Sequence, residues 1–330
     1  MLDPVRIVIL ITLAAFTLLG SVVNGFIVAV NYIDWVKTRN LTPTDIILIS
    51  VGAARFCFQW NIFLEEIVSE FYSDFLAQAQ SGTFSTVTIF LELSGLWFAC
   101  WLSVFYCAKI ANFSHPLFLF VKLKIPRIIS WLLLGSILAS LVTSIPAAWG
   151  LFKEYQRNAT TDLPLTSWSL TNCTLAWHEY QNKTTKEISP NMSEGKAQYK
   201  KFHLIPILSL GYSLPFFICC VAVFLLIGSL WRHTRQMNGN MMGFRNPNLE
   251  AHFIAIKAMA SLLFFYMFYF TFLILDIVYL FSNNDLWKYV TLFVSVSYPS
   301  LHSMILILSN SKLKQSLVRI IHLKIHGSNF

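Results

Sequence analysis

The chain has 330 residues, of which 56% are hydrophobic and only 12% are charged. Soluble globular domains carry about 25% charged residues, so this chain has too few charged side chains to cover a soluble globule of its length. Its 6 cysteines are too sparse for a disulfide scaffold, and a disordered chain would be far more polar. The composition therefore indicates an integral membrane protein.

Seven long apolar segments follow one another along the chain. Each reaches roughly the 20 residues that a tilted helix needs to cross the hydrocarbon core. They cover Ile7–Val30, Thr44–Leu64, Phe84–Ala108, Ile128–Leu151, Phe202–Trp231, Ala251–Phe281 and Trp287–Leu308. The pattern predicts an all-α membrane protein, in which residues 1–330 form a single domain with a seven-transmembrane helix bundle.

The net charge of +8 does not indicate a nucleic-acid partner, because the basic residues lie in short breaks between the apolar segments. Short breaks on one side are rich in lysine and arginine. They hold Lys37, Arg39, Lys122, Lys124, Arg127, Arg232, Arg235, Arg245, Lys312, Lys314, Arg319 and Lys324. The short breaks on the other side hold only Arg6 and Lys288. The positive-inside rule therefore predicts an outer N-terminus and a cytosolic C-terminus in a multi-pass protein of the plasma membrane.

The long break between residues 152 and 201 contains four N-x-Ser/Thr sequons, which begin at Asn158, Asn172, Asn182 and Asn191. A single sequon is weak evidence, but four in one predicted outer loop indicate exposure to the glycosylation machinery. Two further sequons, at Asn40 and Asn112, lie on the predicted cytosolic side, where we expect no glycan.

Ionisable groups inside a bilayer are costly and are therefore candidates for functional roles. Arg55 lies near the middle of the second segment, and Asn24 in the first segment is the expected acceptor at similar depth. The pair is either a polar staple that joins helices one, two and seven or part of a conformational switch. Pro299 interrupts the seventh segment, and prolines of this kind open space between helix ends.

Glu92 lies about two turns inside the outer end of the third segment, on the same helix face as Thr88, Gly95 and Leu96. A carboxylate at that depth is either a salt-bridged structural group or the floor of a ligand cavity. The sixth segment carries many aromatic residues, Tyr269 among them, of which one or two could line such a cavity.

No motif for catalysis, phosphate binding or metal binding is present in the sequence, so we predict no enzyme activity and no cofactor or metal. The inner ends of helices three, five and six instead carry a set of basic and polar residues. These are Tyr106, Lys109, His233, Arg235, His252 and Lys257. They either form a surface for a cytosolic partner or only anchor helix ends to lipid headgroups.

Four stretches resemble the type 2 bitter taste receptors, a family of G-protein-coupled receptors. They are Leu102–Phe118, Ser229–Met237, Pro247–Lys257 and Tyr298–Gln315. Asn24–Ile27, and Ala54 with Arg55 and Trp60, are also similar to the family's first two helices. The resemblance covers nearly the whole chain in the family's order, although Asn246 stands where the family often has aspartate.

The resemblance implies a receptor for small bitter agonists that signals through a gustducin-type heterotrimeric G protein in taste perception. It places the ligand site at Thr88, Glu92, Tyr269 and Leu292. The oligomeric state stays open between a monomer and a homo- or hetero-oligomer. The alternatives are a multi-pass small-solute transporter, which usually shows internal repeats that are not evident here, and a pheromone-type chemosensory receptor.

Overall fold

The computed structural model describes residues 4–71, 74–111, 113, 115–161, 190–238, 260–275 and 285–327, and their regular structure is entirely helical. The labelled helices are α1 (Pro4–Thr38), α2 (Pro43–Phe71), α3 (Asp74–Ile110), α4 (Pro116–Thr161), α6 (Pro190–Asn238), α8 (Asp285–Ser309) and α9 (Ser311–Gly327). A further helix covers Ala260–Leu275.

Six of these helices contain stretches that are long and apolar enough to cross a membrane. The stretches are Arg6–Thr38, Pro43–Phe71, Thr83–Ile110, Phe118–Pro146, Ser209–Arg232 and Val290–Ser309. The shorter apolar helix Ala260–Leu275 is the described part of the predicted sixth segment. The prediction of an all-helical membrane protein is confirmed.

The fourth helix differs from its predicted bounds, because α4 begins at Pro116 rather than near Ile128. The charge of Lys122, Lys124 and Arg127 predicts a loop, yet all three residues lie on the helix. Long cationic side chains can extend along apolar surface to reach the headgroups, so charge alone does not end a helix at the membrane surface.

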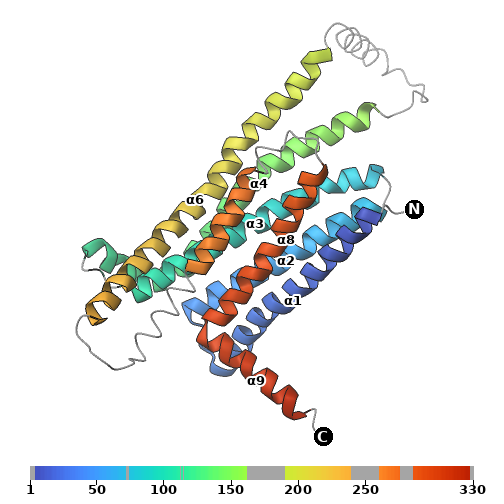
Figure 1. Cartoon of the computed structure of the whole chain (residues 1–330). Helices are drawn as coiled ribbons and strands as arrows, with labels where there is room; N and C mark the ends of the chain where they lie inside the picture. Colours follow the sequence, from blue (N-terminus) through green and yellow to red (C-terminus); the bar gives the residue numbers. More distant parts are fainter. Residues whose placement is uncertain are drawn as a thin grey trace.

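The helices lie side by side as an elongated bundle, from which α9 projects at one end (Figure 1). α3 packs against α2, α4 and α6, while α1 packs against α2 and α8. α3 thus packs against three other helices, with its most extensive contacts to α4 and α2. A polar residue on α3 can therefore join several helices at once.

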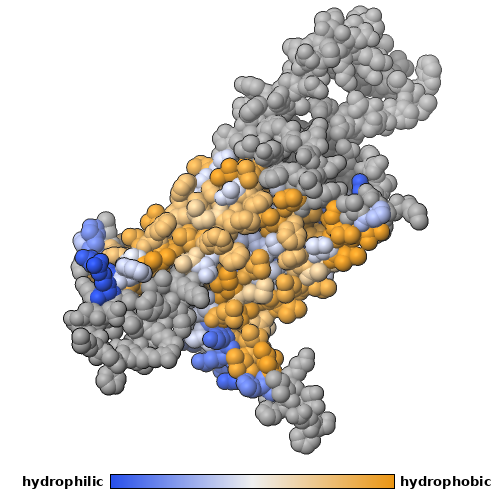
Figure 2. Space-filling view, in the orientation of Figure 1, coloured by the Kyte–Doolittle hydropathy of each residue, from blue (hydrophilic) through white to orange (hydrophobic). Residues whose placement is uncertain are grey.

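The outer surface of the bundle is apolar, and many polar side chains are buried. Figure 2 shows a broad hydrophobic band over the middle of the molecule and hydrophilic residues gathered toward its ends. Trp131, Val142 and Phe264 are each about two-thirds exposed or more, whereas Asn24 and Gln59 are fully buried. This distribution suits a bundle surrounded by lipid, in which polar groups must find partners inside the protein.

The helix ends at the inner side are set by local capping. Thr42 precedes α2, and its hydroxyl accepts a hydrogen bond from the Asp45 amide while the Asp45 carboxylate accepts one from the Thr42 amide. This reciprocal arrangement, followed by Pro43 at the first helical position, is a strong start signal for a helix. Asn310 separates α8 from α9, because its side-chain oxygen accepts hydrogen bonds from the amides of Lys312 and Leu313.

Candidate functional site

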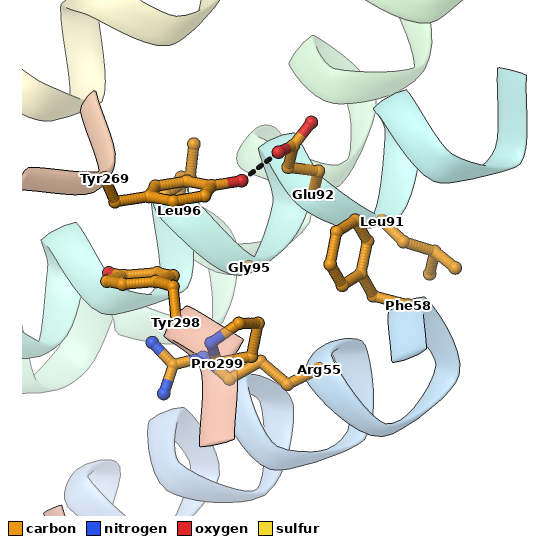
Figure 3. Close-up of a pocket in the computed structure, with 9 residues that line it drawn as sticks. All are labelled: Arg55, Phe58, Leu91, Glu92, Gly95, Leu96, Tyr269, Tyr298 and Pro299. Carbon is orange, nitrogen blue, oxygen red and sulfur yellow. Dashed lines mark hydrogen bonds between the residues drawn. The ribbon is translucent and has the colours of Figure 1, made fainter. Parts of the chain in front are cut away.

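A small cavity lies between α2, α3, α8 and the helix over residues 260–275 (Figure 3). Its lining residues are Arg55, Phe58, Leu91, Glu92, Gly95, Leu96, Tyr269, Tyr298 and Pro299. The cavity measures about 20 Å³, counted as the space open to the centre of a water-sized sphere. That volume has room for about one water molecule. The bundle is therefore nearly closed at this place.

Glu92 joins three helices at the edge of this cavity. One carboxylate oxygen accepts a hydrogen bond from the Tyr212 hydroxyl of α6 at 2.6 Å, and the other accepts one from the Tyr269 hydroxyl. Both tyrosines are buried. Hydroxyl donors of this kind offset the cost of taking a carboxylate out of water, and hydrogen bonds to an ionised acceptor are stronger than neutral ones.

Tyr269 also stacks on Tyr298 of α8, with ring centroids 4.2 Å apart and an angle of 9° between the ring planes. Tyr298 in turn faces Arg55, whose guanidinium carbon lies 5.8 Å from the ring centroid. Figure 3 shows the order: Glu92 and Tyr269 at one side, Tyr298 below them, and Arg55 below Tyr298. The carboxylate and the guanidinium therefore lie on opposite sides of the tyrosine pair.

The predicted contact between Asn24 and Arg55 is wrong in one respect, because Ser303 lies between the two side chains. Arg55 donates to the Ser303 hydroxyl at 2.9 Å, and that hydroxyl donates to the Asn24 oxygen at 2.6 Å. Gln59, one turn farther along α2, donates to the Ser300 hydroxyl at 2.7 Å. The polar contacts do join α1, α2 and α8, with serines of α8 as the connecting groups that the sequence did not single out.

Two of the four residues that the resemblance assigned to the ligand site do not line the cavity. The Thr88 hydroxyl accepts from the Asn61 amide at 2.8 Å, so this side chain is engaged with α2. Leu292 is half-buried against an apolar cluster that contains Leu13 and Val296. Thr88 lies one turn outward of Glu92, and a shared helix face does not bring both side chains to the same depth. Glu92 and Tyr269 do line the cavity, as does Pro299.

Sequence reasoning missed Tyr212 and Tyr298. Tyr212 lies in an apolar stretch of α6 and Tyr298 near Pro299, and neither stands out in hydropathy. The available signal was that a tyrosine hydroxyl inside a span needs a partner, which makes each such tyrosine a candidate for contact with a buried acid.

At the inner end of the bundle, Lys109 and Arg235 are exposed, while Tyr106 is half-buried against the core and lies near Asn310. The side chain of His233, and all of His252 and Lys257, lie outside the described residues. The predicted coupling residues are therefore only partly placed: of that set, Lys109 on α3 and Arg235 on α6 are exposed there.

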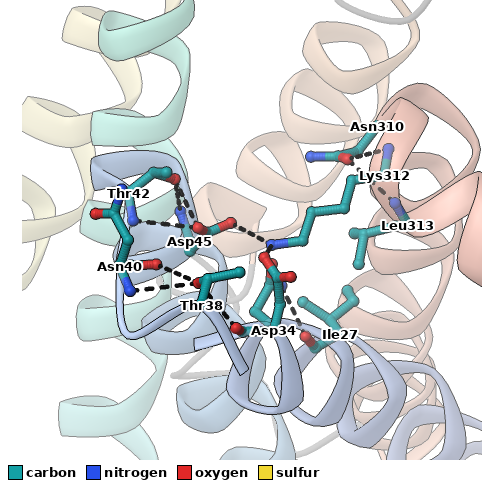
Figure 4. Close-up of polar contacts among 10 residues, drawn as sticks. Ile27, Asp34, Thr38, Asn40, Thr42, Asp45, Asn310, Lys312 and Leu313 are labelled. Carbon is teal, nitrogen blue, oxygen red and sulfur yellow. Dashed lines mark hydrogen bonds and ion pairs between the residues drawn. The ribbon is translucent and has the colours of Figure 1, made fainter. Parts of the chain in front are cut away.

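A second polar cluster at the inner end, defined here as the α9 clamp, consists of Asp34, Asp45 and Lys312 (Figure 4). The Lys312 ammonium lies 2.7 Å from an Asp34 oxygen and 2.9 Å from an Asp45 oxygen. Burial by itself would lower the pKa of Lys312, but its hydrogen bonds and ion pairs with Asp34 and Asp45 outweigh that effect and raise the pKa. The clamp connects α9 to the ends of α1 and α2.

The predicted glycosylation sites lie where α4 ends, where α6 begins and in the residues between them. Asn158 and Asn191 lie on α4 and α6, with their side chains outside the described part, and Asn172 and Asn182 lie outside the described residues. Within the described residues, no group of three or more histidine, cysteine, aspartate or glutamate side chains is placed to hold a metal ion.

Comparison with known proteins agrees with the resemblance noted in the motifs. The family described as "Taste receptor protein (TAS2R)" matches residues 1–324. The chain is 36% identical over 326 residues to taste receptor type 2 member 7 of Papio hamadryas, covering 97% of this chain and 95% of that protein. It is 34% identical over 323 residues to taste receptor type 2 member 8 of Pongo pygmaeus, covering 97% of each.

The match extends over nearly every described helix, including α3 with Glu92 and α8 with Tyr298 and Ser303. A family match of this length, together with relatives above 30% identity over whole chains, decides the assignment. The chain belongs to the taste receptor type 2 (TAS2R) family, a family of seven-transmembrane receptors for bitter compounds.

Proposed function

We propose that small bitter molecules act on this receptor by entering the cavity between α2, α3, α8 and the helix over residues 260–275. The observation that carries the proposal is the Glu92 carboxylate, held by the Tyr212 and Tyr269 hydroxyls at the cavity edge. No other carboxylate among the described residues lines that cavity. A ligand with an amine or a hydroxyl group has a matching partner there.

The size of the cavity bears on how agonists act. Binding sites for small organic ligands typically measure about 300–1,000 Å³, so an agonist does not fit into a space of about 20 Å³. Entry therefore requires either α6 or the helix over residues 260–275, which carries Tyr269, to move away from Glu92. Because a ligand favours the arrangement to which it binds more tightly, such a molecule shifts the bundle toward an opened state.

We further propose that the inner end of the bundle receives the C-terminal helix of a gustducin-type Gα subunit when the helix over residues 260–275 moves. Lys109 and Arg235 are exposed there, and Tyr106, His233, His252 and Lys257 are the further candidates. A cationic surface between helix ends suits a partner with acidic groups and raises its rate of encounter. The bilayer surrounds the seven spans, and the glycans are attached on the outer side within residues 152–201, a range that includes the end of α4 and the start of α6.

The function is tested by measuring calcium responses to a panel of bitter compounds in cells that express the whole chain with a chimeric Gα subunit. We expect saturable responses to one or more small compounds, and no response in cells without the receptor. A receptor that reaches the cell surface and responds to no compound in a broad panel would contradict the assignment of the agonist class.

The coupling surface is tested by replacing Lys109 and Arg235 together with alanine. Loss of two exposed cations is expected to weaken engagement of the G protein by roughly threefold to tenfold, since each surface charge pair contributes up to about 1 kcal/mol. The maximal calcium response should fall while surface expression stays unchanged. Arg319→Ala on α9 is the matched control, because Arg319 is exposed but lies outside this set. An unchanged maximal response in the double variant would assign these cations to headgroup anchoring.

A further inference from the structure

The Arg55 side chain is a buried cation without a carboxylate partner among the described residues. Arg55 is 4% exposed, and its guanidinium donates to the Ser303 hydroxyl. Ion pairs in the described part of the chain include Arg6 with Glu70 and Lys312 with Asp34 and Asp45, which lie at the ends of the bundle. A guanidinium has five N–H donors and cannot lose its proton in a protein, so its charge has to be compensated.

Three more polar atoms near Arg55 are buried without a hydrogen-bond partner: the Tyr266 hydroxyl, the Tyr298 hydroxyl and Nδ1 of His302. The three residues are 2%, 6% and 5% exposed in that order. Buried polar atoms in folded proteins are nearly always hydrogen-bonded, so several such atoms in one place indicate a missing partner.

These groups form one cluster around Tyr298. Its ring centroid lies 6.4 Å from that of Tyr266, 5.5 Å from that of His302 and 5.8 Å from the Arg55 guanidinium carbon. Figure 3 shows the Tyr298 hydroxyl and the Arg55 guanidinium extending toward the same side, away from Glu92. Glu92 is already engaged by two hydroxyls on the other side of the tyrosine pair.

We propose that Arg55, Tyr266, Tyr298 and His302 bind one small inorganic anion, which is chloride under physiological conditions. The guanidinium supplies the charge, the two phenol groups supply hydroxyl donors, and Nδ1 of His302 donates when it carries the ring proton. A single spherical anion satisfies the charge and the unpaired donors together. A water molecule would satisfy hydrogen bonds but leave the charge uncompensated.

The position of the four groups limits the size of the ion. Tyr266, His302 and the Arg55 guanidinium all lie within 6.4 Å of the Tyr298 ring centroid, whereas the small cavity on the other side of Tyr298 is also lined by Glu92, whose carboxylate repels an anion. The ion therefore lies on the guanidinium side of the tyrosine pair, where the close spacing of the side chains favours a small inorganic ion over an organic carboxylate. The four residues come from α2, α8 and the helix over residues 260–275, so the bound ion holds three helices together independently of any agonist.

The proposal is tested by thermal unfolding of the purified full-length receptor at increasing chloride concentration, with gluconate added to keep the ionic strength constant. A ligand that binds only the folded state stabilises it progressively as its concentration exceeds the dissociation constant. We expect the melting temperature to rise with chloride, and with bromide in the same way, but not with gluconate alone.

Tyr266→Phe distinguishes an anion from a structural water. The substitution removes one donor, so the chloride concentration that gives half of the stabilisation should rise roughly tenfold. Tyr32→Phe is the matched control, since Tyr32 is 53% exposed, and its chloride dependence should equal that of the unmodified receptor. Either of two results would overturn the proposal. One is a melting temperature that does not change with chloride concentration, and the other is a Tyr266→Phe variant that needs the same chloride concentration for half of the stabilisation as the unmodified receptor.

Arg55→Gln provides a second test where the variant folds. It removes the charge and is expected to abolish the chloride dependence entirely, because the remaining donors are neutral. If this variant unfolds during purification, Tyr266→Phe decides the question by itself. A folded Arg55→Gln receptor that keeps the full chloride dependence would place the anion elsewhere in the molecule.

Discussion

Replacing Glu92 with alanine is expected to raise the concentration of an amine-bearing agonist that gives half of the maximal response by at least about tenfold, which corresponds to about 1.4 kcal/mol of binding free energy. The substitution removes the carboxylate to which the Tyr212 and Tyr269 hydroxyls donate. A cationic ligand loses its charged partner, and the tyrosines lose the group that orients them.

Glu92→Gln separates charge from hydrogen bonding. Glutamine keeps the shape and one acceptor oxygen but carries no charge, so a cationic agonist should lose potency nearly as much as with alanine. A neutral agonist should lose potency mainly with alanine. Glutamine cannot accept from both tyrosines through two equivalent oxygens, so the neutral agonist should still show a small shift with this variant.

The measurement is the calcium concentration–response curve, corrected for surface expression. Glu65→Gln is the matched control: this carboxylate of α2 accepts a hydrogen bond from Ser85 and does not line the cavity. If neither Glu92 variant changes the curve of any agonist, the agonist site does not include Glu92.

Lys312→Ala is expected to destabilise the receptor by about 1–2 kcal/mol, because it leaves the carboxylate of Asp45 buried without its cation. The Asp45 side chain is 8% exposed, so its charge is poorly solvated once the ammonium is gone, while the Lys312 and Asp34 side chains are 33% and 42% exposed. That exposure is why the expected loss is smaller than for a fully buried pair.

The measurement is the melting temperature of the purified receptor together with its surface expression. Lys314→Ala is the matched control, since Lys314 lies two residues beyond Lys312 on α9, on a different face of the helix, and is exposed. Asp45→Asn combined with Lys312→Ala should recover part of the loss, because the amide no longer carries a buried charge. Equal melting temperatures for Lys312→Ala and Lys314→Ala would show that the clamp does not stabilise the fold.

The pH dependence of the clamp follows from the raised pKa of Lys312. A lysine whose pKa is higher in the folded state than in the unfolded state contributes stability at every pH below its ordinary value of about 10.4. That contribution is lost only as the pH rises through the folded-state value. Lys312 therefore stays protonated and paired with both carboxylates at physiological pH, and it cannot act there as a pH sensor.

The sequence predicted the membrane class, the helical architecture and the family, and it also predicted Glu92 and Tyr269 as cavity residues. The comparison with known proteins confirmed the family and so excluded the alternatives of a transporter and of a pheromone-type receptor. The sequence did not predict that Arg55 contacts Ser303, nor that α4 begins at Pro116. Both failures concern contacts or helix bounds that depend on neighbouring helices.

What the sequence determined by itself is the set of spans and the family, because a membrane span depends on the hydropathy of about 20 consecutive residues and a motif depends on residue order. What only the tertiary structure decided is which polar groups meet inside the bundle. Ser303 lies between Asn24 and Arg55, and Tyr212 reaches Glu92 from α6. The physical reason is that a helix in lipid can be apolar on every side, so its sequence does not encode its rotation or its depth. Those are set by packing against the other helices, and with them the hydrogen bonds that connect the spans.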